Sequence, residues 1–200
     1  MALLIFVRHG QSLYNLENRF TGTLDISLTL LGKEQAKTAG KKLKGYVFCM
    51  AYTSMLIRAQ ESLEIILKQM HVKIPTVKNS AFNERMYGSL QGLNKEETAK
   101  KYGIAQVEIW RRSYDVCPPG GESLLQTYNR VIPYYKTQIE PKLKIGQNVL
   151  IVAHGNSLRS LMMYLENISP IDIVKVNIPT GLPRVYDFNN QLQLSGVKYL

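Results

Sequence analysis

The stretch LLIFVRHG, residues 3–10, places two polar residues, Arg8 and His9, directly after five apolar ones. The stretch NVLIVAHG, residues 148–155, repeats this arrangement with His154. Each apolar run predicts a buried strand, and ligands of open α/β sheets bind beyond the carboxyl ends of the strands. Either histidine alone is equally consistent with a simple strand cap. Together, each followed by a glycine that lets a ligand approach the backbone, they predict one shared crevice.

The rest of the chain alternates short β-rich runs with amphipathic segments, which is typical of an α/β protein. We expect helices at residues 30–43, 55–69, 121–144 and 155–168, the third bent or interrupted at Pro133. Further strands are expected at 46–54, near Val77, at 184–188 and at the C-terminus. The predicted fold is a mostly parallel central sheet flanked by helices on both faces, with an antiparallel edge strand.

The composition predicts one domain over residues 1–200, because 45% hydrophobic residues suffice for one continuous core and no repeat or boundary interrupts the chain. Residues 79–121 are polar and rich in Gly and Pro, with short helical candidates at 95–102 and 105–112. We expect an ordered functional excursion over the sheet edge there. The first apolar run is too short for a signal peptide or a membrane span, so a soluble cytoplasmic protein is expected.

The formal net charge of +10 predicts an anionic partner: nucleic acid, a membrane surface or a phosphorylated metabolite. Several lysines recur at helical spacing and are interpreted as a solvated helix face: Lys33, Lys37, Lys41 and Lys44. The chain lacks the aromatic and basic interleaving of RNA-binding strands, so a nucleic-acid-binding module is the weaker alternative. Two cysteines and three histidines do not supply a zinc cluster of usual spacing, and no metal is expected.

The paired histidines point to phosphoryl transfer. Histidine accepts a phosphoryl group when one ring nitrogen is deprotonated and the other is hydrogen-bonded in place, and a second histidine would stabilise the transferring charge. Guanidinium groups match phosphate oxygens with a two-pronged fork, and Arg8 and Arg58 are the candidates. Taken alone, Arg58 is equally consistent with a surface helix arginine.

The candidate general acid and base is Glu84, in the irregular stretch NERMYGSLQGLNK, residues 83–95. Near a phosphate we expect like-charge repulsion to raise the pKa of Glu84, so that it exchanges protons with a substrate hydroxyl. The competing interpretation is a structural salt bridge with Arg85. Other residues add positive charge and donors to the same excursion: Tyr87, Lys95, Arg111 and Arg112.

In RHGQS and AHGNSLR the chain resembles the histidine phosphatase superfamily. It is similar to the 2,3-bisphosphoglycerate-dependent phosphoglycerate mutase branch in an ordered set of further stretches: NRFTGTLDISLTLLGKEQA, NERMYGSLQGLNK, IWRRSYD, PPGGES and NIPTG. The likeness runs from about residue 3 to residue 186. The first signature marks only the superfamily, whereas the whole ordered set is specific to the branch.

The resemblance implies that His9 is the phosphohistidine nucleophile, Glu84 the proton donor and acceptor, and His154 the group that stabilises the transferring phosphoryl. It implies a phosphate cradle formed by Arg8, Arg58, Asn156 and the backbone of Gly155. It implies further contacts around the phosphoglycerate from Asn15, Thr21 and Gly22, and a grip on its carboxylate and remote phosphate by Tyr87, Lys95, Arg111 and Arg112. Asn15, Thr21 and Gly22 come from the resemblance alone.

The expected activity is the interconversion of 3-phosphoglycerate and 2-phosphoglycerate in glycolysis and gluconeogenesis, primed by 2,3-bisphosphoglycerate and without a metal. The expected partners are phosphoglycerates, not nucleic acid or membrane. Family members often carry an insertion before GES that this chain lacks, which leaves monomer and homo-oligomer open; the short tail leaves retention of the phosphoenzyme open. The nearest alternative is a phosphatase in which water intercepts phospho-His9, and Lys95 with Arg111 and Arg112 favours the mutase.

Overall fold

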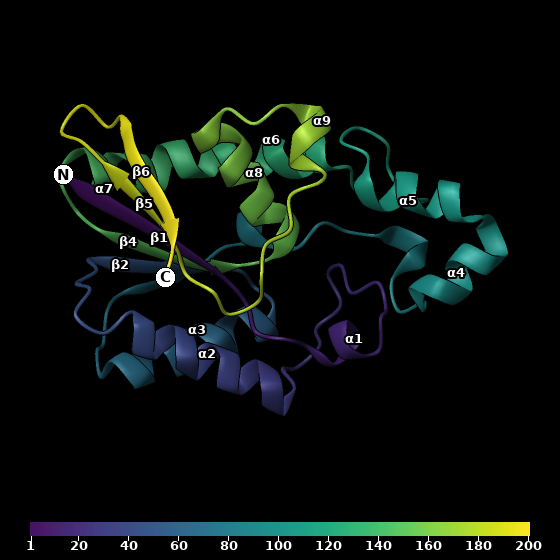
Figure 1. Cartoon of the computed structure of the whole chain (residues 1–200), viewed down its shortest axis with the longest axis horizontal. Helices are drawn as coiled ribbons and strands as arrows, with labels where there is room; N and C mark the ends of the chain where they lie inside the picture. The colour runs from purple at the N-terminus through teal and green to yellow at the C-terminus, as the bar shows by residue number, and fades with distance from the viewer.

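The computed structural model describes residues 1–200 and contains one six-stranded sheet with helices on both faces (Figure 1). The strands are β1 (Ala2–Arg8), β2 (Met50–Thr53), β3 (Thr76–Lys78), β4 (Val149–Ala153), β5 (Arg184–Phe188) and β6 (Leu194–Tyr199). Their order is β3-β2-β4-β1-β5-β6, parallel from β3 to β1 and antiparallel from β1 to β6. The predicted mostly parallel sheet is confirmed, but its antiparallel edge has two strands, because β5 and β6 pair with each other.

The helices form two layers and one projection (Figure 1). They are α1 (Leu13–Leu16), α2 (Leu30–Lys42), α3 (Ile57–Met70), α4 (Lys95–Tyr102), α5 (Ile104–Arg112), α6 (Leu124–Tyr134), α7 (Glu140–Lys144), α8 (Gly155–Glu166) and α9 (Pro170–Ile173). α2 and α3 cover one face of the sheet, and α6, α7 and α8 cover the other. α4 and α5 extend beyond the sheet. None of these helices combines the length and the apolar character that a membrane crossing requires.

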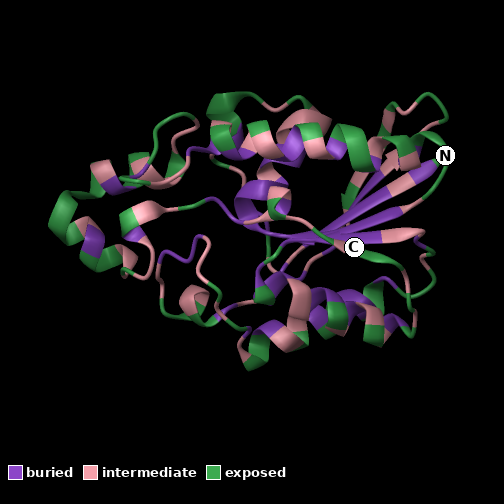
Figure 2. Ribbon diagram, turned by 180° about the vertical axis from the view of Figure 1, so that it is seen from behind, coloured by how far each residue is buried: buried purple, intermediate pink, exposed green.

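The central strands are buried on both faces, which explains their unbroken apolar runs (Figure 2). Alternate side chains of a strand point to opposite faces. Accordingly, Leu4 and Phe6 of β1 join the cluster that packs beneath α6 and α8, whereas Ile5 and Val7 join the cluster beneath α2 and α3. The strand is therefore held from both sides, and the position of its carboxyl end is well defined.

A close backbone contact fixes the loop that follows β1. A Cβ on Gly10 would lie 2.1 Å from the carbonyl oxygen of Gly32, in the first turn of α2, so no larger residue fits. That first turn is set by Thr29, whose side chain accepts a hydrogen bond from the Gly32 N–H. Glycine at position 10 thus lets α2 pack directly against the segment that carries His9.

Pro133 neither ends nor breaks the helical segment after residue 121. α6 runs through it to Tyr134, a π-helical turn covers Tyr135–Ile139, and α7 continues from Glu140. Proline lacks the N–H that an α-helix needs, and the wider turn accommodates the altered hydrogen bonding just beyond it. The predicted interruption is therefore a local change of helix type.

Residues 79–121 hold little regular structure besides α4 and α5, which lie close to their predicted ranges. Two short 3₁₀ turns, Ser80–Phe82 and Gly88–Leu90, flank Glu84. A small apolar cluster of Phe20, Leu90 and Val107 packs beneath this region, separate from the clusters of the sheet. No strand of the sheet lies in this part of the chain, and an isolated antiparallel bridge between Arg19 and Asn94 joins the side-chain contacts in holding it.

Candidate active site

The two histidines lie side by side because β1 and β4 are paired neighbours. The His9 N–H donates to the carbonyl oxygen of Ala153 at 3.0 Å, which extends the parallel ladder one residue beyond β1. The rings of His9 and His154 are 4.9 Å apart between centroids. Both side chains are buried, with 3% and 0% of their residue surface exposed. The two rings thus lie together, as expected, and that both face one crevice stays a prediction.

His9 has one ring nitrogen held and the other without a bond in the protein. Its Nδ1 lies 2.7 Å from the carbonyl oxygen of Gly10. A carbonyl only accepts, so Nδ1 carries the proton and Nε2 keeps its lone pair. Burial, together with the charges of Arg58 and Arg8, holds the pKa of His9 well below its ordinary value. His9 is therefore a neutral imidazole, the form that attacks phosphorus.

His154 is held from the other side. Its Nε2 lies 2.7 Å from Oγ of Ser54, and its buried Nδ1 has no hydrogen-bond partner. Burial, with the charges of Arg58 and the neighbouring His9, holds the pKa of His154 well below its ordinary value. A protonated His154 consequently requires a nearby anion. The buried Nε of Arg8 also lacks a partner. A bound phosphate would satisfy both the His154 Nδ1 and the Arg8 Nε.

Arg58 is a buried arginine of the site, not a surface residue of α3. It is 1% exposed, and its Nη1 and Nη2 donate to the carbonyl oxygens of Leu24 and Gly22 at 2.8 and 2.7 Å. Burial lowers the pKa of Arg58 to about 10, which leaves the guanidinium charged at neutral pH. Arg8 is fixed in a similar way, since its Nη1 donates to the Ile178 carbonyl at 2.8 Å.

The carboxylate of Glu84 is buried at the N-terminus of α8. Its Oε1 accepts from the backbone N–H groups of Arg85, at 2.8 Å, and Asn156, at 3.1 Å. Burial raises the pKa of Glu84, but the Arg85 N–H, the charges of Arg58 and Arg8, and Asn156 together lower it further, so the net shift is downward. The protein's own groups therefore oppose the predicted rise, which depends entirely on an anion beside Glu84.

The alternative of a salt bridge between Glu84 and Arg85 is wrong. The Arg85 guanidinium points to the C-terminal end of α5 instead, where its Nη2 donates to the carbonyl oxygens of Trp110 and Arg111 at 3.1 and 2.9 Å. It also lies over the ring of Tyr87, 4.6 Å from the centroid. Arg85 thus supports the site from behind and leaves Glu84 free for chemistry.

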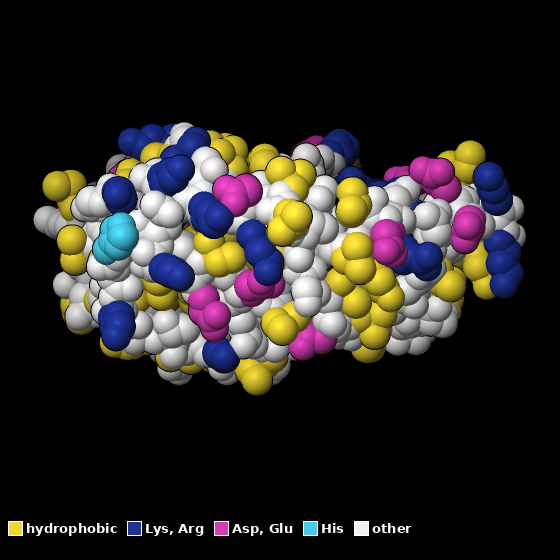
Figure 3. All heavy atoms as spheres, turned by 90° about the horizontal axis from the view of Figure 1, so that it is seen from below, with side chains coloured by type: hydrophobic (Ala, Val, Ile, Leu, Met, Phe, Trp, Pro, Cys, Tyr) yellow, Lys and Arg dark blue, Asp and Glu magenta, His cyan; other side chains and the backbone are white.

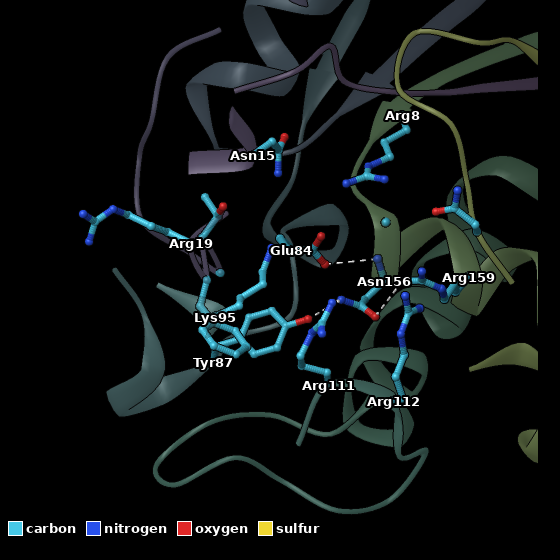
Figure 4. A pocket seen from close by; sticks show the side chains of 15 residues that line it. Arg8, Asn15, Arg19, Glu84, Tyr87, Lys95, Arg111, Arg112, Asn156 and Arg159 are labelled. Atoms are coloured by element: carbon cyan, nitrogen blue, oxygen red, sulfur yellow. Dashed lines mark hydrogen bonds between the residues drawn. The ribbon is translucent and has the colours of Figure 1, made fainter. Parts of the chain in front are cut away.

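A polar cleft opens in front of these groups (Figure 4). It is lined by Arg8, Asn15, Arg19, Phe20, Thr21, Gly22, Glu84, Tyr87, Lys95, Arg111, Arg112, Gly155, Asn156, Arg159 and Asn177. The lining contains every predicted site residue except three buried ones: His9, Arg58 and His154. In Figure 4, Glu84 and Asn156 lie between Arg8 and the group formed by Tyr87, Lys95, Arg111 and Arg112.

The charge of the cleft is strongly unbalanced. Six cationic side chains line it against one carboxylate, Glu84, and only two of the six pair with carboxylates outside the lining, Arg19 with Glu17 and Arg111 with Glu108. Burial and the neighbouring Arg111 lower the pKa of Lys95, as expected where cations crowd together. On the face formed by α2 and α3, in contrast, basic side chains mix with acidic ones (Figure 3), and Lys33 and Lys37 pair with Glu61 and Glu34. The anion-binding potential is therefore concentrated in the cleft.

A model of the histidine phosphatase superfamily, branch 1, matches residues 4–192. The chain belongs to this superfamily. It is 56% identical over 200 residues to the 2,3-bisphosphoglycerate-dependent phosphoglycerate mutase of Cytophaga hutchinsonii, covering 100% of this chain and 94% of that one. It is 54% identical over 190 residues to the protein of that name from Bradyrhizobium diazoefficiens, covering 94% and 92%. The solved structure of Bacillus stearothermophilus YhfR shares the fold, with a TM-score of 0.85 at 24% identity over 97% and 94% of the chains.

Four residues line the cleft of this superfamily member without having been predicted from the sequence: Arg19, Phe20, Arg159 and Asn177. Arg159 follows Asn156 by three residues on α8, and its Nη1 donates to the Asn156 Oδ1 at 3.1 Å. Helical spacing within AHGNSLR was therefore a usable signal. Arg19 and Asn177 lie in NRFTG and NIPTG, whose loop structure gives no periodicity to assign a direction. Metal independence stays a prediction, although no cluster of three His, Cys, Asp or Glu side chains that would hold an ion is found.

Proposed function

We propose that this member of the histidine phosphatase superfamily is a 2,3-bisphosphoglycerate-dependent phosphoglycerate mutase that interconverts 3-phosphoglycerate and 2-phosphoglycerate. The observation that carries the proposal is a cleft with two cationic ends: Arg8 beside the histidine pair, and Lys95, Arg111 and Arg112 beyond Glu84. A substrate with two anionic groups matches this arrangement. The names of relatives at 56% and 54% identity support it.

The first role belongs to His9. 2,3-Bisphosphoglycerate, when bound, supplies the phosphoryl group. The hydrogen bond that Nδ1–H donates to the Gly10 carbonyl orients the ring and leaves the lone pair of Nε2 to form the N–P bond. Arg8 and Arg58 are charged donors fixed by backbone carbonyls, so they stabilise the transferring group without reorganisation. His154, once protonated beside the anion, adds charge on the same side.

Glu84 moves the proton. Its lowered pKa keeps the carboxylate deprotonated at neutral pH, ready to accept a proton from the 2-hydroxyl of 3-phosphoglycerate. As that oxygen forms its P–O bond, the N–P bond to His9 breaks. The bisphosphorylated species then reorients in the cleft. Its 3-phosphoryl group is transferred to Nε2 of His9, and the proton held by Glu84 goes to the departing O3.

The far end of the cleft distinguishes a mutase from a phosphatase. Tyr87, Lys95, Arg111 and Arg112 would hold the carboxylate and the remote phosphate, and Asn15, Thr21 and Gly22 line the same cleft. A second anion grip keeps the bisphosphorylated species bound while it reorients. A phosphatase that releases its product after one transfer does not need such a grip.

The proposed setting is the cytoplasmic conversion of phosphoglycerates in glycolysis and gluconeogenesis, with no metal and no nucleic acid. The test is a coupled assay of 2-phosphoglycerate formation with a trace of 2,3-bisphosphoglycerate in excess chelator, run beside an assay of phosphate release. We expect sustained mutase activity that exceeds phosphate release. Faster phosphate release would show a phosphatase, and loss of activity in chelator would show a metal-dependent reaction. Nucleic acid binding that survives His9→Ala would favour the nucleic-acid-binding alternative.

A further inference from the structure

Glu84 is fixed in place although no helix or strand contains it. It lies between the two 3₁₀ turns of the excursion, and its carboxylate must reach a substrate oxygen within hydrogen-bond distance. A segment outside the helices and strands needs another support. That support comes from Arg130, on α6.

Arg130 binds the backbone on the N-terminal side of Glu84. Its Nη1 donates to the carbonyl oxygen of Ala81 at 2.7 Å, and its Nη2 donates to those of Asn83, at 3.0 Å, and Glu84, at 3.3 Å. The same guanidinium forms a two-pronged pair with Glu122, with Nε to Oε1 at 2.7 Å and Nη2 to Oε2 at 2.9 Å. The ion pair with Glu122 fixes the orientation of the Arg130 guanidinium, and the guanidinium in turn fixes the backbone before Glu84.

Glu122 binds the backbone on the C-terminal side of Glu84. Its N–H donates to the carbonyl oxygen of Met86 at 2.8 Å, and its Oε2 accepts from the Met86 N–H at 3.3 Å. Arg130 and Glu122 therefore hold the loop on both sides of the proton-transfer residue. We call these two residues the loop clamp.

The loop clamp lies behind Glu84, away from the substrate cleft. Arg130 and Glu122 line a second cleft together with Thr23, Ser80, Asn83, Met86, Gly121 and Gln126. Glu84 lines both clefts, and no other residue does. Arg130 thus acts through Glu84 and does not contact the substrate.

We propose that the loop clamp is a positioning device for proton transfer by Glu84, an inference that rests on the proposed function. When an alkyl phosphate phosphorylates His9, the N–P bond forms, the P–O bond breaks, and the leaving oxygen takes a proton from Glu84, whose carboxyl group is kept protonated in this complex by the bound anion beside it. p-Nitrophenyl phosphate reacts at the same nitrogen, but its leaving oxygen departs as a stable phenolate and takes no proton. Loss of the clamp therefore slows the first reaction and spares the second.

The experiment compares single-turnover phosphorylation of His9 by 2,3-bisphosphoglycerate with the burst of p-nitrophenolate from p-nitrophenyl phosphate. For Arg130→Met we expect the first rate to fall by about 100-fold, within the range of general acid catalysis, and the second by less than about threefold. Glu84→Gln should show the same split. Arg130→Lys keeps the charge but not the two-pronged guanidinium. It should show a smaller difference between the two rates, in the same direction, and it replaces Arg130→Met in the test if that variant does not fold.

The matched control is Arg184→Met. Arg184 pairs with Glu166 at 2.7 Å, outside both clefts, and this pair is as well covered as the loop clamp, with side-chain exposures of 14% and 19% against 27% and 17%. We expect it to change neither rate. Equal losses with both phosphoryl donors, or no loss in either Arg130 variant, would overturn the inference. A wild-type chain that p-nitrophenyl phosphate labels and 2,3-bisphosphoglycerate does not would instead overturn the proposed function.

Discussion

The two halves of the site are built in different ways. His9 and His154 follow paired strands, so backbone hydrogen bonds and two packed faces of the sheet fix them. Glu84 lies on an irregular part of the excursion, and the far end is formed largely by the ends of α4 and α5. Side chains such as Arg85 and Arg130 hold this region by donating to backbone carbonyls. The group that forms a covalent bond thus stands on the rigid part. The groups that recognise and protonate the substrate stand on the part that side-chain contacts keep in place.

The largest effect is expected on the rigid half. His9→Ala should lower mutase activity by at least about 10⁴-fold, because it removes the nucleophile and leaves only binding and electrostatic contributions. The coupled assay measures it, with circular dichroism to confirm folding. His71→Asn, at the exposed left-handed end of α3, is the control and should retain full activity. Substantial activity in the His9→Ala chain would place the nucleophile elsewhere.

The next effect is the pH dependence of the free energy of unfolding, in which the histidines of the rigid half take effect at higher pH than Glu84. His9 and His154 have pKa values held below the ordinary 6.5 by burial and nearby arginines, so the unfolded chain binds protons there before the folded chain does. The free energy of unfolding should accordingly fall as the pH drops below about 6.5, by up to about 2.7 kcal/mol per pH unit for two histidines. The lowered pKa of Glu84 adds a loss of the same sign at lower pH.

Denaturant unfolding at several pH values measures this slope. His9→Gln should reduce the histidine contribution by about half, since one of the two buried imidazoles is gone. A stability that is flat between pH 7 and pH 5 would contradict the neutral, buried state of both rings.

A smaller effect is expected at the far end of the cleft. Lys95→Met should lower kcat/KM for 3-phosphoglycerate by about 30-fold, corresponding to about 2 kcal/mol for a charged hydrogen bond. The burst from p-nitrophenyl phosphate, which has no second anionic group, should stay within about twofold. The surface variant Lys37→Met is the control. An equal loss with 3-phosphoglycerate and with p-nitrophenyl phosphate would mean that Lys95 serves the phosphoryl-transfer end and would remove the contrast between the two halves.

The rigid half was largely predictable from the sequence, because its signals are local. The continuous apolar runs before His9 and His154 are buried strands, and adjacent parallel strands bring their carboxyl ends together. Arg58 was also predicted as a site residue, but its neighbours in the helix gave no sign that it is buried against the carbonyls of Gly22 and Leu24. Local pattern predicts an element well and the partners of its polar groups poorly.

The excursion was less predictable, because its order comes from contacts between residues far apart in the chain. Arg130 and Ala81 are 49 positions apart, and neither belongs to a motif that was interpreted. The pKa of Glu84 is lowered by the adjacent Arg85 N–H, but also by Arg58, Arg8 and Asn156, which lie far away in the chain. Glu84 itself was found because a carboxylate in an irregular polar stretch is chemically unusual. The residues that hold Glu84 in place could be identified only from the structure.

The central claim is a covalent phosphoryl group on His9, and one measurement tests it directly. The folded chain is incubated with isotopically labelled 2,3-bisphosphoglycerate, quenched, and mapped for an acid-labile, base-stable label. We expect label on His9 alone, absent from His9→Ala and discharged by 3-phosphoglycerate to give labelled product. A folded, active chain that carries no label on His9, or carries it on another residue, would contradict the account.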